Sequence, residues 1–328
     1  MFALEVHDLR KTYPAKPPVD AVQGVSFTVP EGQIVALLGP NGAGKTTTLK
    51  CILNLVRPTA GAVRVYGRDH NDLRHLYRHA AAVLEGNRNI FWRLTPRQNL
   101  EVFAAYAGVP PRAARDAIAR WLAFFGLEDL DRETRNLSRG QQQKVALAAA
   151  LVKSTPLLAL DEPTLGLDVE AKRELVPLIR RLAREEGKTI LLTSHQMDVV
   201  EALADRVIVI QDGRVIVEDS PEGLRRLFDA QTYRITVQVP DHALPPAFLA
   251  RWHAQVEPRG NGEVTLRVTL PQAQALYRLL DDLEALGAVL RAVEPDLPDL
   301  EEAYLRLIRQ SAPAPTPASA SLVGGSHA

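Results

Sequence analysis

One nine-residue stretch has the residue types and spacing of a phosphate-binding loop. It fits the pattern G-x-x-x-x-G-K-[ST], whose glycines let the backbone curl so that its N–H groups face a di- or triphosphate. Lys45 would reach the β- and γ-phosphates, and the Thr46 hydroxyl would bind Mg²⁺. The residues expected to contact the phosphates are Gly39, Pro40, Asn41, Gly42, Ala43, Gly44, Lys45, Thr46 and Thr47.

The segments on either side of this loop supply the context that such a motif requires. An apolar run at residues 34–38 predicts a buried strand before the loop, and residues 45–55 predict a helix after it. The positive end of that helix would add to the attraction for phosphate. A glycine-rich turn that binds nothing is the alternative, and the complete match in its proper context disfavours it.

A pair of carboxylates follows a second apolar run. Residues 157–160 predict a strand buried on both faces, and Asp161 and Glu162 come directly after it, where parallel sheets bind ligands. One acid could hold Mg²⁺ while the other polarises a water, as hydrolysis of a phosphoanhydride requires. His195 follows another predicted strand, residues 189–193. A lone histidine is usually structural, but its place at this same edge favours a role in the site.

Two further motifs have more than one reading. Ser138 and Gln141 form a capping box, so the free N–H groups at Ser138, Arg139 and Gly140 could bind an anion; an ordinary well-capped helix is an equally good reading of these residues alone. Tyr13 lies in a loop ahead of the phosphate loop and could stack on a purine, although an exposed loop tyrosine is most often ordinary surface.

Length and composition limit the classes of function. A chain of 328 residues with 46% hydrophobic residues predicts more than one domain and an ample core. Because 39 basic residues balance 39 acidic ones, we expect no nucleic-acid partner and no overall electrostatic attraction to a membrane surface, although local charged patches remain possible. Cys51 is the only cysteine, which fits a reducing cytoplasm. No signal peptide or run of about 20 apolar residues is visible, so we expect any membrane role to be peripheral.

The first two thirds of the chain read as layers around these motifs. Strands at residues 4–9 and 22–29, the second with alternating polarity, predict a half-buried antiparallel layer. A helical layer follows, in which one helix begins with a capping box at Thr95 and another stops at Gly126. A hairpin turning at Asp212-Gly213 closes this part.

The remainder of the chain predicts a smaller unit and a tail. After a short linking helix near residues 222–228, residues 233–310 give the order strand, helix, strand, strand, helix, strand and an added last helix at 300–308. This is a βαββαβ pattern of ferredoxin-like type. Residues 311–328 are rich in Ala, Pro and Ser and are predicted to be a disordered tail.

The order of these motifs over residues 4–227 resembles the nucleotide-binding subunit of an ABC transporter. The resemblance assigns an aromatic A-loop at Tyr13, Walker A at 39–47, a Q-loop position at Glu85, the signature at 137–141, Walker B at 157–162, a D-loop at 165–168 and the switch histidine His195. It implies an α/β fold: a P-loop NTPase (RecA-like) cassette over residues 1–228, with an antiparallel β subdomain and an α-helical subdomain at about 86–154. The small α+β domain at 229–310 would be an accessory.

The resemblance also implies ligands, partners and roles. Two cassettes, alike or different, would face head to tail, each ATP lying between Walker A of one and the signature of the other. Ser138, Gly140 and Gln141 would then bind nucleotide, with Ser138 and Gly140 contacting the γ-phosphate in trans. The residues expected in catalysis are Glu162, His195 and Lys45, and those expected at Mg²⁺ are Thr46, Asp161 and Glu85.

Two positions depart from the family pattern. Arg139 replaces the commoner glycine of the signature, and Glu85 replaces glutamine, which keeps a side-chain oxygen and adds a possible charge. Residues 299–305 are similar to a stretch found in ATPases of ABC-2 type exporters. We therefore expect an ATPase on the inner face of the cell membrane that powers export by a separate integral-membrane permease.

Two other classes of protein fit the sequence less well. An ABC ATPase of DNA repair or of ribosomes is disfavoured by the single cassette, the neutral charge and the lack of a long heptad insertion or of cysteine zinc sites. A protein that binds ATP without turnover would be favoured by loss of Glu162 or His195, and both are present.

Overall fold

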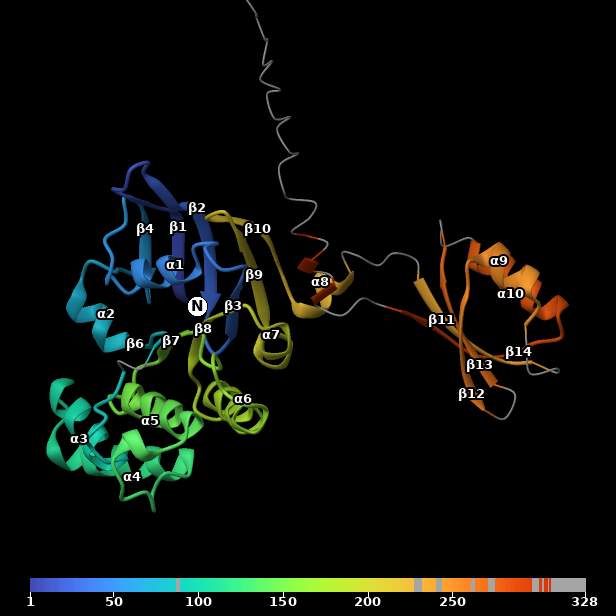
Figure 1. Ribbon diagram of the computed structural model, residues 1–328. Coiled ribbons are helices and arrows are strands. Elements are labelled where there is room, and N and C mark those ends of the chain that lie inside the picture. The colour runs from blue at the N-terminus through green and yellow to red at the C-terminus, as the bar shows by residue number, and fades with distance from the viewer. Residues whose placement is uncertain are drawn as a thin grey trace, which may run out of the picture.

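Three β-sheets organise the part of the chain that the computed structural model describes, and Figure 1 shows their order along it. The described residues are 1–86, 89–226, 232–239, 244–260, 263–270 and 275–296, together with 301, 302, 304, 305 and 307. Residues 1–226 are called the N-terminal part below, and residues 232–296 the C-terminal part.

The first sheet is the predicted antiparallel layer. Its four strands lie in the order β2-β1-β4-β5, and β1 pairs with both β2 and β4 in antiparallel register. The strands run beyond their predicted ends, so that β1 carries Tyr13 as its last residue. Their bounds are β1 Phe2–Tyr13, β2 Val19–Pro30, β4 Ala60–Val65 and β5 Arg68–Asp69.

The second sheet places the candidate chemistry at one edge. Its order is β10-β9-β3-β8-β7-β6, and β3, β7 and β8 are buried along their whole length, as their apolar runs predict. The parallel register pairs Asp161 with Thr193 and Leu38 with Ser194, so the carboxyl ends of these strands coincide. The bounds are β3 Ile34–Leu38, β6 Ala80–Val83, β7 Leu157–Asp161, β8 Thr189–Ser194, β9 Arg206–Gln211 and β10 Arg214–Asp219.

Helices surround this sheet, and three of them gather at one end of the N-terminal part as the predicted helical layer (Figure 1). These three are α3 Pro96–Tyr106, α4 Pro111–Phe125 and α5 Arg139–Leu151, with the 3₁₀ turn η1 Thr134–Asn136 before α5. Both predicted capping boxes are present, and Gly126 ends α4 in the left-handed conformation. The others are α1 Lys45–Ile52, α2 Leu73–His79, α6 Val169–Arg184, α7 Met197–Leu203 and α8 Pro221–Arg226. No helix in the described ranges is long and apolar enough to cross a membrane.

The third sheet confirms the ferredoxin-like pattern of the C-terminal part. Its strands lie in the order β12-β13-β11-β14, and every neighbouring pair is antiparallel. A separate core, which includes Ile235, Leu266 and Leu279, fills this unit. The bounds are β11 Thr232–Gln238, α9 Pro246–Trp252, β12 Gln255–Gly260, β13 Glu263–Thr269, α10 Ala275–Ala285 and β14 Val289–Pro295.

The predicted last helix packs on the N-terminal part. Its described residues are helical, and Tyr304, 9% exposed, belongs to the core around the central sheet, with Leu307 packed against that core. Burial raises the pKa of Tyr304 to about 12. The tail at 311–328 and the boundary at 228 lie outside the described residues, so the domain division stays a prediction.

A fragment of residues 1–228 is expected to fold by itself, because its two cores draw all their buried members but Tyr304 from that range. Losing Tyr304 leaves a gap, so the fragment and full-length Tyr304→Ala should each lose roughly 2–4 kcal/mol of unfolding free energy. Urea unfolding followed by circular dichroism measures this. Tyr277→Ala, at an exposed tyrosine of α10, is the control and should change stability by less than about 0.5 kcal/mol. A fragment without a cooperative transition would contradict the division.

Candidate active site

The phosphate loop lies between β3 and α1, pressed against neighbouring backbone. Gly44 is the N-cap of α1 with φ 99°, and a Cβ there would lie 2.3 Å from the Ala21 carbonyl oxygen. A Cβ on Gly39 would lie 2.2 Å from the carbonyl oxygen of Ile210. Both contacts are far shorter than van der Waals distance, so these positions require glycine. The loop is thereby fixed between β2 and β9.

Lys45 is held under the loop with its charge directed toward the acids. It is 6% exposed, and its Nζ donates to the carbonyl oxygens of Gly39 at 2.7 Å and Pro40 at 3.2 Å. Burial lowers the pKa of Lys45, while the negative charge of Glu162, 3.7 Å from Nζ, opposes this effect. Among the described residues, the ammonium therefore has only exchangeable carbonyl partners besides this acid, and a phosphate oxygen could replace them.

The paired acids have different neighbours. Asp161 Oδ1 accepts the hydroxyls of Thr46 at 2.9 Å and Thr193 at 2.7 Å, whereas Glu162 Oε1 lies 3.0 Å from His195 Nδ1. The second oxygen of each carboxylate, Asp161 Oδ2 and Glu162 Oε2, is buried without a hydrogen-bond partner among the described residues. Buried carboxylate oxygens normally have donors or a cation. This site therefore has the groups to receive one.

The donor set fits Mg²⁺. Thr46 and Asp161 offer hard oxygen atoms, one of them the unpartnered Oδ2. Mg²⁺ prefers few protein carboxylates and completes its shell with water and phosphate oxygens. A hydroxyl and one carboxylate beside a phosphate loop meet that preference.

A cavity of about 560 Å³ joins most of the residues proposed from the sequence. It is lined by Tyr13, Val19, Ala21, residues 40–47, Glu85, Glu162, Leu165 and His195. Lys11 Nζ lies 5.1 Å from the centroid of the Tyr13 ring, so this tyrosine is already engaged with a cation. Glu85 is exposed at the end of β6 and borders both this cavity and a second one lined by Asp161 and Arg139. The cavity can hold a ligand with a ring at one end and phosphates at the other.

The signature residues lie elsewhere. Ser138 Oγ accepts the N–H of Gln141 at 3.2 Å, and the Gln141 side chain accepts the N–H of Ser138 at 3.1 Å. Gly140 is packed so closely that a Cβ would lie 2.7 Å from the Cβ of Ala171. None of these three residues lines the cavity of the phosphate loop. Arg139 Nη1 donates to the Gly166 carbonyl at 3.3 Å, which links the signature to the D-loop of the same chain.

Three residues of the site were not singled out from the sequence. Thr193 is fully buried, and its hydroxyl donates to Asp161 and accepts the Glu162 N–H at 3.0 Å. Its position just before His195, at the end of a predicted strand, was the signal that could have found it. Val19 and Ala21 line the cavity from the start of β2, where the preceding proline-rich segment gave no signal.

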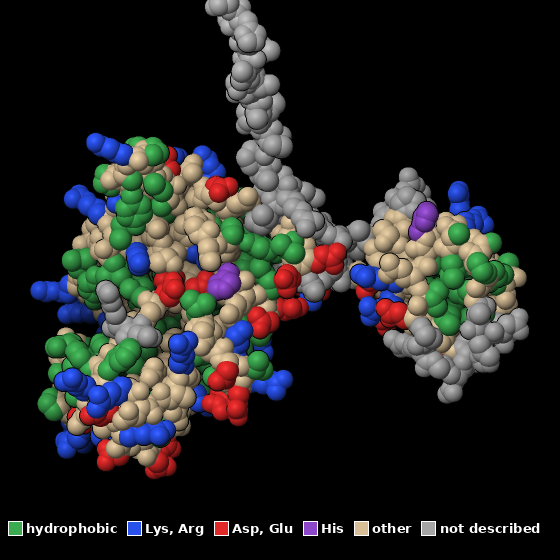
Figure 2. Space-filling view, viewed as in Figure 1, with side chains coloured by type: hydrophobic (Ala, Val, Ile, Leu, Met, Phe, Trp, Pro, Cys, Tyr) green, Lys and Arg blue, Asp and Glu red, His purple; other side chains and the backbone are tan. Residues whose placement is uncertain are grey.

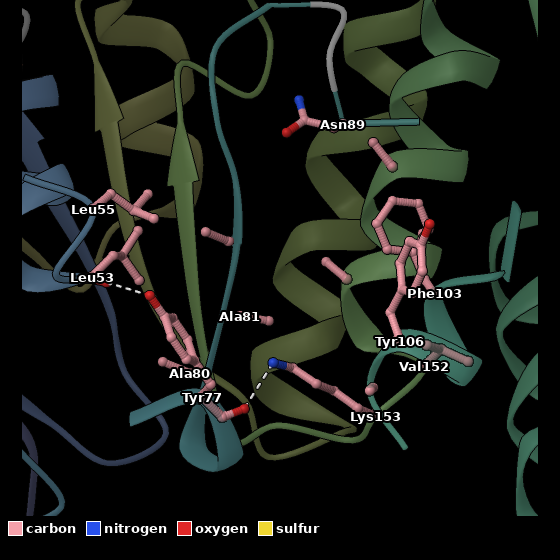
Figure 3. A pocket seen from close by; sticks show the side chains of 15 residues that line it. Leu53, Leu55, Tyr77, Ala80, Ala81, Asn89, Phe103, Tyr106, Val152 and Lys153 are labelled. Carbon is pink, nitrogen blue, oxygen red and sulfur yellow. Dashed lines mark hydrogen bonds between the residues drawn. The ribbon is translucent and has the colours of Figure 1, made fainter. Parts of the chain in front are cut away.

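A separate, largely apolar groove opens between the central sheet and the helical layer (Figure 3). It has a volume of about 390 Å³, and Tyr106, 76% exposed, and Leu55 project at its sides. The Tyr77 hydroxyl donates to the Leu53 carbonyl at 3.3 Å, and Lys153 Nζ donates to the Tyr77 carbonyl at 2.8 Å. Burial lowers the pKa of Lys153. Contiguous exposed apolar side chains of this kind mark protein contact surfaces.

Comparisons with known proteins point in one direction. A family model described as "ABC transporter" matches residues 22–165. The chain is 42% identical over 204 residues to the Nod factor export ATP-binding protein I of Burkholderia orbicola, which covers 62% of this chain and 67% of that protein. It is 35% identical over 292 residues to the protein of the same name in Burkholderia thailandensis, covering 88% and 89% of the two chains.

Solved structures give the same picture. One is a dimeric ATP-binding cassette in a post-hydrolysis state with ADP and Pi, which has a TM-score of 0.59 and 28% identity over 66% of this chain and 98% of that one. Another is an ATP-binding subunit of an ABC transporter, with a TM-score of 0.60 and 32% identity over 69% and 93% of the chains.

Thr193→Val should destabilise the protein. The change removes a donor from buried Asp161 and an acceptor from the Glu162 N–H without altering shape, so the unfolding free energy should fall by about 1–3 kcal/mol. Thr193→Ser keeps the hydroxyl and should lose less than about 1 kcal/mol. Urea unfolding of the three proteins compares them. A Thr193→Val protein as stable as the parent would show that these two hydrogen bonds do not stabilise the fold.

Proposed function

Because the chain belongs to the ABC transporter family, we propose that it is the ATP-binding and ATP-hydrolysing subunit that powers export by a separate membrane permease. One observation carries this proposal: the Lys45 ammonium and the His195 ring both approach the same oxygen of Glu162, at 3.7 Å and 3.0 Å, inside the cavity of the phosphate loop. A cation, a base and an imidazole so placed are the parts that hydrolysis of a nucleoside triphosphate requires.

The first step is binding. The adenine of ATP stacks on Tyr13, and the backbone N–H groups of residues 41–47 surround the β- and γ-phosphates. Lys45 exchanges its loop carbonyls for phosphate oxygens. Thr46 and Asp161 would hold Mg²⁺, and the bound ion would supply positive charge next to the phosphates. Glu85, at the rim of the cavity, would offer an oxygen on the metal side.

The second step is hydrolysis. Glu162 orients a water and accepts its proton as the water oxygen bonds to the γ-phosphorus and the bond to the β–γ bridging oxygen breaks, giving ADP and phosphate. His195 Nδ1 holds the Glu162 carboxylate. The His195 side chain also steadies the γ-phosphate. Thr193 positions both acids through its hydroxyl.

A second cassette completes each site. Ser138 and Gly140 lie outside the cavity of their own chain, so the N-terminus of α5 is free to contact nucleotide held by a partner, with Gln141 fixing its cap. The dimeric cassette among the similar structures supports this arrangement, with identical or different chains.

The permease would dock in the apolar groove shown in Figure 3. The groove shares Asn89 and Ala146 with the second cavity, which Glu85 also lines. A permease segment in the groove would therefore contact residues that border the Glu85 side of the nucleotide site. This docking would place the protein at the inner face of the cell membrane as a peripheral subunit. The ferredoxin-like unit at 229–310 would be a separate accessory domain, and the extended match to the Burkholderia thailandensis protein supports a shared role for it.

Glu162→Gln should keep ATP binding but slow hydrolysis by about 10²–10⁴-fold, because the amide cannot accept the proton of water. The variant should also accumulate as an ATP-bound dimer. Phosphate release, fluorescent-nucleotide binding and light scattering measure the three effects. Glu101→Gln, at an exposed acid of α3, is the matched control and should behave as the parent. Hydrolysis at the parent rate by Glu162→Gln would remove Glu162 from the mechanism.

Glu85→Gln should retain hydrolysis within about tenfold, or ~1.4 kcal/mol of barrier, while changing the dependence of the rate on Mg²⁺ or its stimulation by the permease. The reason is that an ionised Glu85 attracts the metal and also repels the γ-phosphate, whereas the amide keeps an oxygen for the metal without the negative charge. Titrations of ATPase rate against Mg²⁺, with and without the permease, provide the measurement. Superimposable curves for both proteins in both settings would show that Glu85 has no part in coupling.

A further inference from the structure

A basic cavity opens beside α2, outside the site described above. It has a volume of about 300 Å³ and is lined by Arg68, Asp72, Arg74, His75, Arg78 and His79. Arg74 and Arg78 are exposed and make no ion pair with any described residue, and Arg68 only approaches Asp72, at 3.9 Å. Lys and Arg side chains protrude along the edge of the N-terminal part where Figure 1 places α2 (Figure 2).

Two imidazole rings line this basic cavity together with the arginines. The rings of His75 and His79 are stacked, with centroids 4.0 Å apart. His75 Nε2 donates to the Val65 carbonyl at 2.9 Å, and His79 Nδ1 donates to the His75 carbonyl at 2.9 Å. Since carbonyls only accept, these bonds fix the tautomer and the orientation of both rings. The two imidazoles are therefore held in place, and the exposed guanidinium groups of Arg74 and Arg78 lie beside them.

The acids nearby do not neutralise it. Asp72 caps α2 by accepting the His75 N–H at 3.1 Å, and Asp69 accepts the N–H of Asn71 at 2.8 Å. The stretch 64–79 has four arginines against these two aspartates, whereas the whole chain has equal numbers of basic and acidic residues. The positive charge is therefore local. Guanidinium groups bind phosphate oxygens in a bidentate way, so the ligand that this surface fits is a phosphate-bearing anion.

The position of α2 indicates which kind of molecule would supply the phosphate-bearing anion. Its Tyr77 lines the apolar groove, while Arg78 and His79 line the basic cavity, so one helix borders both surfaces. Leu73, on the same helix, is 47% exposed. If a permease fills the groove, the lipid headgroups around that permease lie next to α2. We propose that the basic face of α2 binds anionic phospholipid headgroups of the cytoplasmic leaflet. This proposal rests on the proposed function in one respect, because it is the permease that would bring the chain to the bilayer.

Flotation of the full chain with vesicles tests this without a permease. The wild type should float with vesicles of about 30 mol % phosphatidylglycerol in phosphatidylcholine and not with phosphatidylcholine alone, because each surface arginine adds to the attraction for an anionic leaflet. Arg74→Glu with Arg78→Glu should reduce partitioning by roughly tenfold or more. The matched control is Arg112→Glu with Arg115→Glu, two exposed arginines one turn apart on α4, which should partition as the wild type does.

Several outcomes would overturn the proposal. Equal flotation on both vesicle types would show that the protein does not recognise anionic headgroups. An equal loss in the α2 and α4 variants would show that net charge, and not the face of α2, causes binding. Release of the protein by inorganic phosphate, at an ionic strength matched with chloride, would identify a small-anion site instead of a membrane surface. ATPase rates without vesicles should be the same in all three proteins, which shows that they are folded. If the wild-type protein does not hydrolyse ATP, the proposed function is wrong, but the flotation result still decides whether α2 binds anionic lipid.

Discussion

The structure depends on the burial of charged side chains at the carboxyl edge of the central sheet. Lys45, Asp161 and Glu162 are each less than a tenth exposed, and the strand that leads to the two acids, β7, is otherwise apolar. Charges removed from water are tolerated only when they are paired and hydrogen-bonded. Here the pairing is incomplete, because one oxygen of each carboxylate has no protein partner among the described residues. The fold thus holds the acids in place and leaves one oxygen of each available, as the proposed binding of nucleotide and metal requires.

The parallel sheet is what makes this cluster possible. The phosphate loop, the paired acids and His195 are far apart in the sequence, and each follows a different buried strand. Parallel register brings the three strand ends to one edge, and the hydroxyl of Thr193 then lies opposite Asp161. Because the loop is closed by backbone contacts at Gly39 and Gly44, its N–H groups are fixed before a ligand arrives. The site is therefore preorganised by register and sterics more than by side-chain packing.

Sequence patterns predicted most of this architecture and missed specific parts for physical reasons. Buried apolar strands, capping boxes and the βαββαβ order are local signals, and the structure confirms them. The helix α2 and strand β6 were missed because α2 is short and rich in Arg and His, and β6 is mostly alanine, so neither has a clear period. Helix α7 was also missed, because it begins without a side-chain cap that the sequence could indicate. The contact of Tyr304 with the first core and the role of Thr193 depend on tertiary neighbours, which no local pattern specifies.

The loop between β6 and α3 connects the ATP site to the groove by direct bonds. Near Glu85, the side chain of Asn89 accepts the Leu84 N–H at 3.1 Å and donates to the Leu84 carbonyl at 2.6 Å. Further along, buried Asn99 of α3 accepts the Phe91 N–H at 2.7 Å and donates to the Thr134 hydroxyl at 3.0 Å, just before the signature. A shift of the helical layer that follows a change in the groove must therefore move both the Glu85 side of the cavity and the start of α5. Under the proposed function, a single displacement would reach the nucleotide of its own chain through Glu85 and that of a partner through Ser138, which would give the coupling between transport and hydrolysis a physical route.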